Sequence, residues 1–190
     1  MVKIKIGVSS CLLGERVRYN GGHKYSQVVI DLLGERFEAV PVCPEVEMGV
    51  PREPVQLVAG GECIVGDSSN STQKLPPGIS KLPPRVVVVG VESGKDWTEA
   101  LNNFNSRQLK ELTNLSGFIF KSRSPSCGTQ AVPVHKETNG ATSAGLFALA
   151  FMQHFPRVPV IDEEQLQDKQ ARENFIVCVE KYGGSLNQAG

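Results

Sequence analysis

Three cysteines lie where the sequence pattern favours metal binding or catalysis. Cys11 lies in GVSSCLLG, Cys43 in VPVCPEV and Cys127 in FIFKSRSPSCG, each directly after a short apolar run. All three are surrounded by Gly, Pro or Ser, where a thiol is accessible and backbone N–H groups can donate hydrogen bonds to a thiolate. A lone cysteine is more often a small buried hydrophobe, and we expect Cys63 and Cys178 to be either that or a stray thiol.

The apolar runs predict strands, and amphipathic segments between them predict helices. We expect strands at residues 2–8, 37–42, 85–91, 117–121 and 158–161, and helices at residues 24–36, 96–115, 144–155 and 171–182. Strands that alternate with helices of this length predict βαβ units. The expected fold class is therefore α/β: a single domain over residues 1–190, with a mostly parallel Rossmann-like sheet and helices on both faces.

Finer details of these elements can also be predicted. The four valines of 85–91 suit a strand covered on both faces, as in a parallel sheet. Asp96 is the expected N-cap of its helix, and Gly183 with Gly184 the expected end of the last helix. Residues 50–84, rich in Gly, Pro and Ser, predict a long loop with one short hairpin, and such loops often cover a binding site.

The carboxyl ends of parallel strands meet at one edge of a sheet, where ligands bind. The three thiols should therefore converge there. Structural zinc normally takes four protein ligands, often in Cys-x-x-Cys pairs, and this sequence has no such pair. Three thiolates without a fourth ligand suit an iron–sulfur cubane with one open iron. None of the three histidines is close in sequence to one of these cysteines: His23, His135 and His154. His23 is a candidate for a residue near the site or for an ordinary turn residue.

The charge balance and the lack of long apolar runs exclude some classes of protein. Lysine plus arginine equals aspartate plus glutamate, 20 each, with a pI near 6.8, which argues against sequence-independent binding to nucleic acid. The sequence has no signal peptide and no apolar run of the roughly 18 residues that a membrane span requires. We therefore expect a cytoplasmic protein whose five cysteines are reduced.

The segments around these cysteines resemble the thiouracil desulfurase family. The blocks that carry the resemblance are SSCLLGERVRYNGG, VPVCPEVEMGVPREP and FKSRSPSCG, in that order, with Asn20 where the family more often has Asp. The closing stretch FPRVPVIDEEQLQDKQARENF is similar to a branch that includes tRNA thiouridine desulfurases and carries a further C-terminal domain. We expect no such domain here.

The resemblance implies a [4Fe-4S] cluster on Cys11, Cys43 and Cys127, and catalytic roles for Glu45 and Ser124. It implies hydrolysis of the C=S bond of a thiolated uracil, with release of sulfide and no net electron transfer. From the residues alone, Glu45 would be a solvated or helix-starting carboxylate, and Ser124 a turn cap before Pro125. Neutral charge favours a small thiolated pyrimidine over tRNA; a monomer and a homodimer are both compatible.

Other classes of protein stay open at this stage. In the segment 90–96, GVESGKD, the glycines are one residue too close for a P-loop and Asp96 replaces the magnesium-binding Ser or Thr, so we reject a nucleotide-binding module. A cysteine-nucleophile enzyme would need one activated thiol with a histidine partner. A non-catalytic iron–sulfur or zinc protein would need a fourth ligand.

Five basic residues are expected near the site, where they could offset the negative charge of a cluster or bind a substrate phosphate: Arg16, Arg18, Arg52, Lys121 and Arg123.

Overall fold

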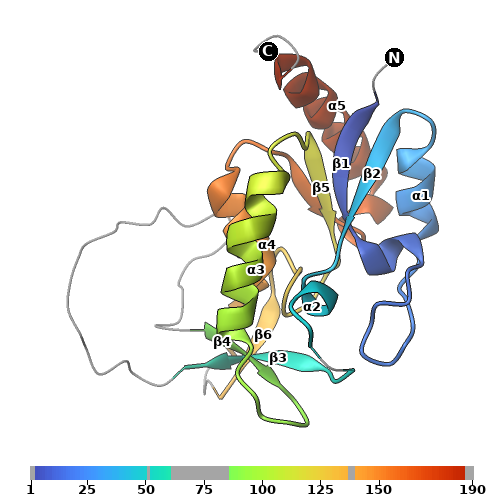
Figure 1. Cartoon of the computed structure of the whole chain (residues 1–190). Helices are drawn as coiled ribbons and strands as arrows, with labels where there is room; N and C mark the ends of the chain where they lie inside the picture. The colour runs from blue at the N-terminus through green and yellow to red at the C-terminus, as the bar shows by residue number, and fades with distance from the viewer. Residues whose placement is uncertain (1–2, 51, 61–85, 137–139, 187–190) are drawn as a thin grey trace, which may run out of the picture.

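A parallel four-stranded sheet forms the centre of the protein. The computed structural model describes residues 3–50, 52–60, 86–136 and 140–186. The strand order is β2-β1-β5-β8, all parallel, and Figure 1 shows β1, β2 and β5 running in the same direction. The strands are β1 (Ile4–Ser9), β2 (Phe37–Val42), β5 (Gly117–Phe120) and β8 (Val160–Asp162). The expected α/β class with a parallel sheet is confirmed.

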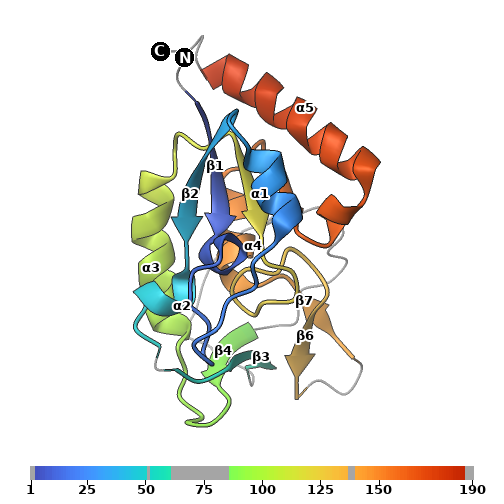
Figure 2. The ribbon, with the colours of Figure 1, turned by 90° about the vertical axis from the view of Figure 1, so that its right-hand side faces the viewer.

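Helices cover both faces of this sheet, as expected (Figures 1 and 2). On one side lie α1 (Gln27–Leu33) and α5 (Lys169–Leu186), and on the other α3 (Thr98–Glu111) and α4 (Leu146–His154). The alternation of side chains along β5 explains the two cores: Phe118 and Phe120 pack with α3 and α4, whereas Ile119 packs with α1 and α5. Each core buries large apolar side chains, which is the main favourable term in folding.

The contact between β1 and β5 depends on a residue without a side chain. A Cβ atom at Gly7 would lie 2.3 Å from the ring of Phe118, which is fully buried and stacked on Phe120 with ring centroids 4.0 Å apart. Glycine is therefore required at this point of β1 for the aromatic core to form.

A second sheet, which the sequence did not predict, lies beyond the carboxyl ends of the first (Figure 1). Its order is β4-β3-β6-β7, with β4 (Val86–Gly90) antiparallel to β3 (Val55–Ala59), β6 (Val132–His135) parallel to β3, and β7 (Thr142–Ser143) antiparallel to β6. The expectation that the valine run belongs to the parallel sheet was wrong, because consecutive valines report burial and not the direction of the neighbouring strand.

The region expected as one long loop, residues 50–84, contains a strand. Strand β3 occupies Val55–Ala59 and pairs antiparallel with β4, which lies after this region, so the pairing does not test the short hairpin expected within it. Residues 61–85, which include Cys63, lie outside the described residues.

Two helix boundaries differ from expectation. Trp97 is the N-cap residue of α3, and the side chain of Asp96 still accepts a 2.8 Å hydrogen bond from the N–H of Thr98. Helix α5 does not end at Gly183 and Gly184 but continues to Leu186. Gly183 packs so closely on Ser116 that a Cβ atom would lie 2.9 Å from its hydroxyl oxygen, so this glycine serves helix packing and not termination.

Of the two expectations for Cys178, a small buried hydrophobe or a stray thiol, the structure supports the second. Its thiol is exposed on α5, between the buried residues Phe175 and Val179. The helical spacing places Phe175 and Val179 toward the sheet and turns position 178 outward.

None of the helices in the described part of the chain is long and apolar enough to cross a membrane.

Candidate active site

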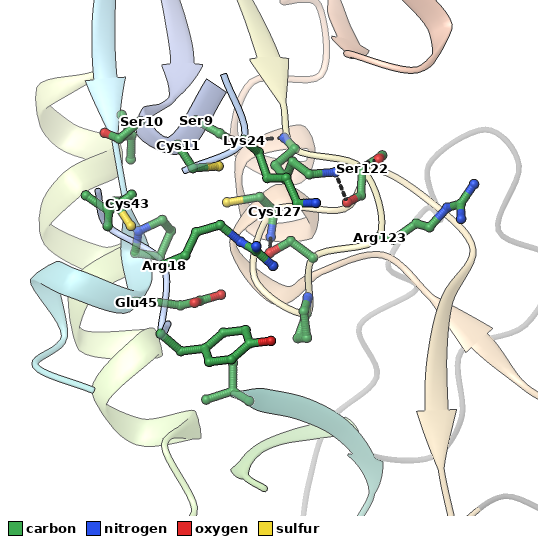
Figure 3. Close-up of a pocket in the computed structure, with 18 of the residues that line it drawn as sticks. Ser9, Ser10, Cys11, Arg18, Lys24, Cys43, Glu45, Ser122, Arg123 and Cys127 are labelled. Carbon is green, nitrogen blue, oxygen red and sulfur yellow. Dashed lines mark hydrogen bonds between the residues drawn. The ribbon is translucent and has the colours of Figure 1, made fainter. Parts of the chain in front are cut away.

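The three cysteines line one pocket at the carboxyl-terminal edge of the parallel sheet. The pocket has a volume of about 250 Å³, and its lining includes Cys11, Cys43, Cys127, Glu45 and Ser124. Figure 3 shows the three thiols converging from different segments, with Glu45 nearby. The structure thus brings together all five residues that the sequence singled out. Their chemical roles remain predictions.

The sheet topology explains the convergence. Cys11 lies in the 3-10 helix η1 (Ser10–Leu13) directly after β1, and Cys43 is the N-cap residue of the short helix α2 (Pro44–Glu47) directly after β2. Cys127 lies in the loop that follows β5. Since β2, β1 and β5 are neighbours in the sheet, three positions far apart in the chain end at the same edge.

The loop that carries Cys127 is held by its own serines. The hydroxyl oxygen of Ser124 accepts hydrogen bonds from the backbone N–H groups of Ser126 (3.2 Å) and Cys127 (3.1 Å). The carbonyl of Ser126 accepts from the N–H of Phe147 (3.0 Å), which joins the loop to the first turn of α4. Ser124 therefore is the turn cap that the residues alone suggested, and it also lines the pocket.

Burial disfavours the ionised form of all three thiols. It raises the pKa of Cys11 to about 11 and that of Cys43 to about 12, and it raises the pKa of the buried Cys127 well above its ordinary value. Ionised Cys11 and Cys43 would raise the pKa of Cys127 further, which shows that the thiols are electrostatically close. Three thiolates in one buried pocket repel one another, so they need a compensating positive charge, which a bound metal group provides.

Hydrogen-bond donors oppose this cost at two of the thiols. At Cys43 the backbone N–H groups of Val46 and Glu45, in α2, donate to the thiolate and lower its pKa against the larger effect of burial. At Cys127 the hydroxyl of Ser9 acts in the same way. We expected backbone N–H donors near the cysteines, and Cys43 has them, although they belong to the short helix α2.

Opposing influences act on the pKa of the Glu45 carboxyl. Burial raises this pKa, while hydrogen bonds from the hydroxyls of Ser126 and Ser124 and the positive charge of Arg18 act in the opposite direction. The Ser126 hydroxyl donates to Glu45 Oε1 at 3.1 Å. A carboxyl whose pKa is raised by burial accepts a proton more readily than a solvated one, which is the property that a general base requires.

Basic and aromatic side chains surround the opening. Arg18, Lys121 and Arg123 line the pocket, and Arg16 with Arg52 lines an adjoining pocket of about 290 Å³ that shares Arg18 and Glu45 with the first. Tyr19, which is 40% exposed, lines both pockets, and the guanidinium of Arg18 lies 5.4 Å from the centroid of its ring.

Two other candidates from the sequence lie outside this arrangement. His23 is exposed, and its Nδ1 accepts a 3.2 Å hydrogen bond from the N–H of Tyr25, so it serves as a turn residue. In the turn after β4, the N–H groups of Glu92 and Ser93 donate to the carboxylate of Glu53 at 3.2 and 2.9 Å. An acidic side chain thus takes the backbone donors that a P-loop would offer to phosphate.

Sequence reasoning missed Ser9, Tyr19 and Lys24, which line the pocket, and Ser126, whose hydroxyl donates to Glu45. Ser9 and Ser126 each lie close to one of the three cysteines in the quoted motifs, and this proximity was the available signal. Tyr19 and Lys24 approach through a loop whose course depends on tertiary packing, so no local pattern indicates them.

The described residues supply this pocket with three thiols and the carboxylate of Glu45. Among those residues, no group of three His, Cys, Asp or Glu side chains is arranged to hold a single metal ion, and the pocket lining contains no fourth cysteine and no histidine. The fold and the site define the class as an α/β protein with a three-thiol pocket beside a half-buried carboxyl. Comparison with known proteins identifies the family within this class.

The chain belongs to the 2-thiouracil desulfurase family, whose sequence model matches residues 6–163. It is 35% identical over 173 residues to the uncharacterized protein YbbK of Bacillus subtilis (strain 168), an alignment that covers 85% of this chain and 97% of YbbK. Its fold is similar to the solved structure of the [4Fe-4S]-dependent thiouracil desulfidase TudS, with a TM-score of 0.54 and 28% identity over 87% of this chain and 94% of that one.

Proposed function

We propose that this protein binds a [4Fe-4S] cluster through Cys11, Cys43 and Cys127 and hydrolyses the C=S bond of a thiolated uracil to give uracil and hydrogen sulfide. The observation that carries the proposal is the convergence of three thiols from separate strands on one pocket that also contains Glu45. Membership of the 2-thiouracil desulfurase family and the likeness to TudS support it.

The donor set of the pocket fits such a cluster. Thiolates are the ligands that iron–sulfur clusters require, and the three thiols are free, not joined in disulfides. When bound by three cysteines, the cluster supplies one open Lewis-acidic iron with affinity for the sulfur of the substrate.

Glu45 is the proposed general base. Its carboxylate takes a proton from the water that attacks the thiocarbonyl carbon, and returns the proton to the ring nitrogen or to the departing sulfur. The hydroxyl of Ser126 orients the carboxylate through its 3.1 Å hydrogen bond. The hydroxyl of Ser124, which donates to Glu45 in the absence of substrate, would turn its single proton to the substrate when the substrate binds. The net reaction exchanges sulfur for the oxygen of water, so no electron is gained or lost.

The dimensions of the pocket favour a single ring. A cluster held by the three thiols would occupy part of its volume of about 250 Å³, so the space left for the substrate suits a small ligand. Val55 and Pro54 add apolar lining, and the exposed ring of Tyr19 at the opening offers a surface on which a pyrimidine can stack.

A thiouridine nucleoside or nucleotide is the second candidate substrate. The adjoining pocket carries the guanidinium groups of Arg16, Arg18 and Arg52, which suit a phosphate by charge and by hydrogen-bonding geometry. Glu45 lines both pockets, so a base in the first pocket would extend its sugar toward the second. Thiouridine in tRNA would use the same contacts, but the chain as a whole has no excess of positive charge.

Anaerobic reconstitution followed by a sulfide-release assay tests the proposal. Substrates would be 2-thiouracil, 4-thiouracil, thiouridine, its 5′-phosphate and thiolated tRNA. We expect sulfide from at least one thiolated pyrimidine, with the uracil product formed in equal amount. Absence of sulfide from every substrate with a fully loaded cluster would overturn the proposed reaction, and activity that needs one of the three cysteines and no iron would instead favour a cysteine nucleophile.

A further inference from the structure

Lys121 lines the pocket and forms an ion pair with Glu163, and this pair has no role in the reaction as proposed above. Lys121 directly follows β5 and Glu163 directly follows β8, and these two strands are paired in the sheet. The side chains are 20% and 13% exposed, in contrast to the neighbouring pair Arg123–Glu164, which is 74% and 52% exposed.

Hydrogen bonds fix the position of this ammonium group. Lys121 Nζ donates to Glu163, to the carbonyl oxygen of Ser122 (2.9 Å) and to the hydroxyl of Ser122 (2.8 Å), so all three of its donors are used. Glu163 is held in turn by the N–H and the hydroxyl of Ser122, both at 2.7 Å. The backbone N–H of Lys121 donates to the hydroxyl of Ser9 at 2.9 Å. The network therefore links the ends of three neighbouring strands.

The pair is oriented with its positive end toward the thiols. Lys121 lines the pocket together with Cys11, whereas Glu163 lies behind it, outside the described lining. A buried ion pair costs desolvation and often adds little stability. Its orientation toward Cys11 suggests an electrostatic use.

We propose that Lys121, held in place by Glu163 and Ser122, is the fixed cation that balances the negative charge of the three thiolates and of the anionic hydrosulfide product. This inference rests on the proposed function, because it concerns the charge of the cluster site and its product. Lys121 acts on the reacting groups through its charge, and Glu163 is a positioning residue that acts only through Lys121. Neither residue needs to gain or lose a proton in this role.

The test compares Lys121→Met and the charge-retaining Lys121→Arg with the wild-type protein, all reconstituted anaerobically. The readouts are iron content, the midpoint potential of the cluster and the inhibition constant of hydrosulfide. We expect Lys121→Met to shift the potential to more negative values and to weaken hydrosulfide inhibition by about tenfold. We expect Lys121→Arg to restore most of both properties.

Matched controls remove similar charges from exposed pairs. Lys169→Met and Glu173→Gln each remove one partner of an exposed salt bridge on α5, away from the pocket lining, and should leave the potential and the inhibition constant unchanged. If Lys121→Met fails to fold because Glu163 is left buried without a partner, the double variant Lys121→Met/Glu163→Gln gives the test instead. It removes the positive end of the pair that lines the pocket but leaves the net charge unchanged, so we expect shifts of the same sign and smaller size.

The outcomes separate this inference from the proposed function. Unchanged potential and inhibition in Lys121→Met or the double variant, with a loaded and active wild type, would overturn the role of Lys121 alone. Equal shifts in Lys121→Met and Lys121→Arg would also overturn it, because charge would not be the cause. A wild type that neither binds a cluster nor releases sulfide would overturn the proposed function and this inference with it.

Discussion

The hydroxyl of Ser126 donates a 3.1 Å hydrogen bond to Oε1 of Glu45, a residue 81 positions away in the chain. Ser126 is completely buried and directly precedes Cys127, while Glu45 lies two residues after Cys43. One hydrogen bond therefore joins the segments that carry two of the three thiols and holds the proposed general base between them.

We expect Ser126→Ala to reduce kcat by about tenfold with little change in KM, since the carboxylate of Glu45 loses the donor that orients it. Sulfide release at varied substrate concentration measures this. Ser106→Ala, which removes an exposed hydroxyl on α3, is the control and should leave both constants unchanged. A rise in KM alone would assign Ser126 to substrate binding instead.

Glu45→Gln should lower kcat by at least about a hundredfold, because an amide cannot take a proton from water. Iron and sulfide contents should stay at the wild-type level, since Glu45 is not a proposed ligand. The comparison of turnover with iron content in the same preparation checks both statements. Wild-type turnover in the variant would remove Glu45 from the mechanism.

Gly145→Ala should destabilise the protein by roughly 1–3 kcal/mol and reduce iron content. A Cβ atom there would lie 2.5 Å from the carbonyl carbon of Ser126 and 2.7 Å from the nitrogen of Cys127, so the loop that carries Cys127 would have to move. Denaturant unfolding measures the change.

The control for Gly145→Ala is Gly184→Ala. Gly184 lies in α5, and a Cβ atom at this position would have no described neighbour within 4 Å. Alanine there should therefore leave iron content unchanged and stabilise the helix by about 0.5–1 kcal/mol. Equal behaviour of the two variants would contradict the close approach at Gly145.

Stability of the cluster-free protein should depend on Glu163 in a pH-dependent way. Burial raises the pKa of Glu163, but the hydrogen bonds from Lys121 and Ser122 outweigh burial and hold it below its ordinary value of 4.5. Ionised Glu163 therefore stabilises the folded state above the pKa of the unfolded chain, and this contribution is lost as pH falls through the lower, folded-state pKa.

Glu163→Gln should accordingly be less stable than the wild type at pH 7, and the difference should shrink as the solution is acidified below pH 4.5. Urea unfolding at both ends of this range measures it, with Glu164→Gln as the exposed control. A difference that stays constant over the range would show that ionisation of Glu163 does not contribute.

The sequence predicted the parallel sheet and the meeting of the thiols because both follow from local patterns. Apolar runs mark β1, β2 and β5. A parallel arrangement of these strands places Cys11, Cys43 and Cys127 at one edge of the sheet, independently of how the other segments fold. The second sheet was not predicted, since the valines of β4 carry no information about their partner β3. The Lys121–Glu163 pair depends on the register between β5 and β8, which no local pattern reveals.

The ligand assignment is tested most directly by iron and acid-labile sulfide counts on anaerobically reconstituted wild type and on Cys11→Ala, Cys43→Ala and Cys127→Ala, with Cys178→Ala as the control on the exposed thiol. We predict about four irons and four sulfides per wild-type chain and per Cys178→Ala chain, and loss of the cluster in each of the other three variants. An iron-free wild type after reconstitution, or a full cluster in any one of those three variants, would contradict the account.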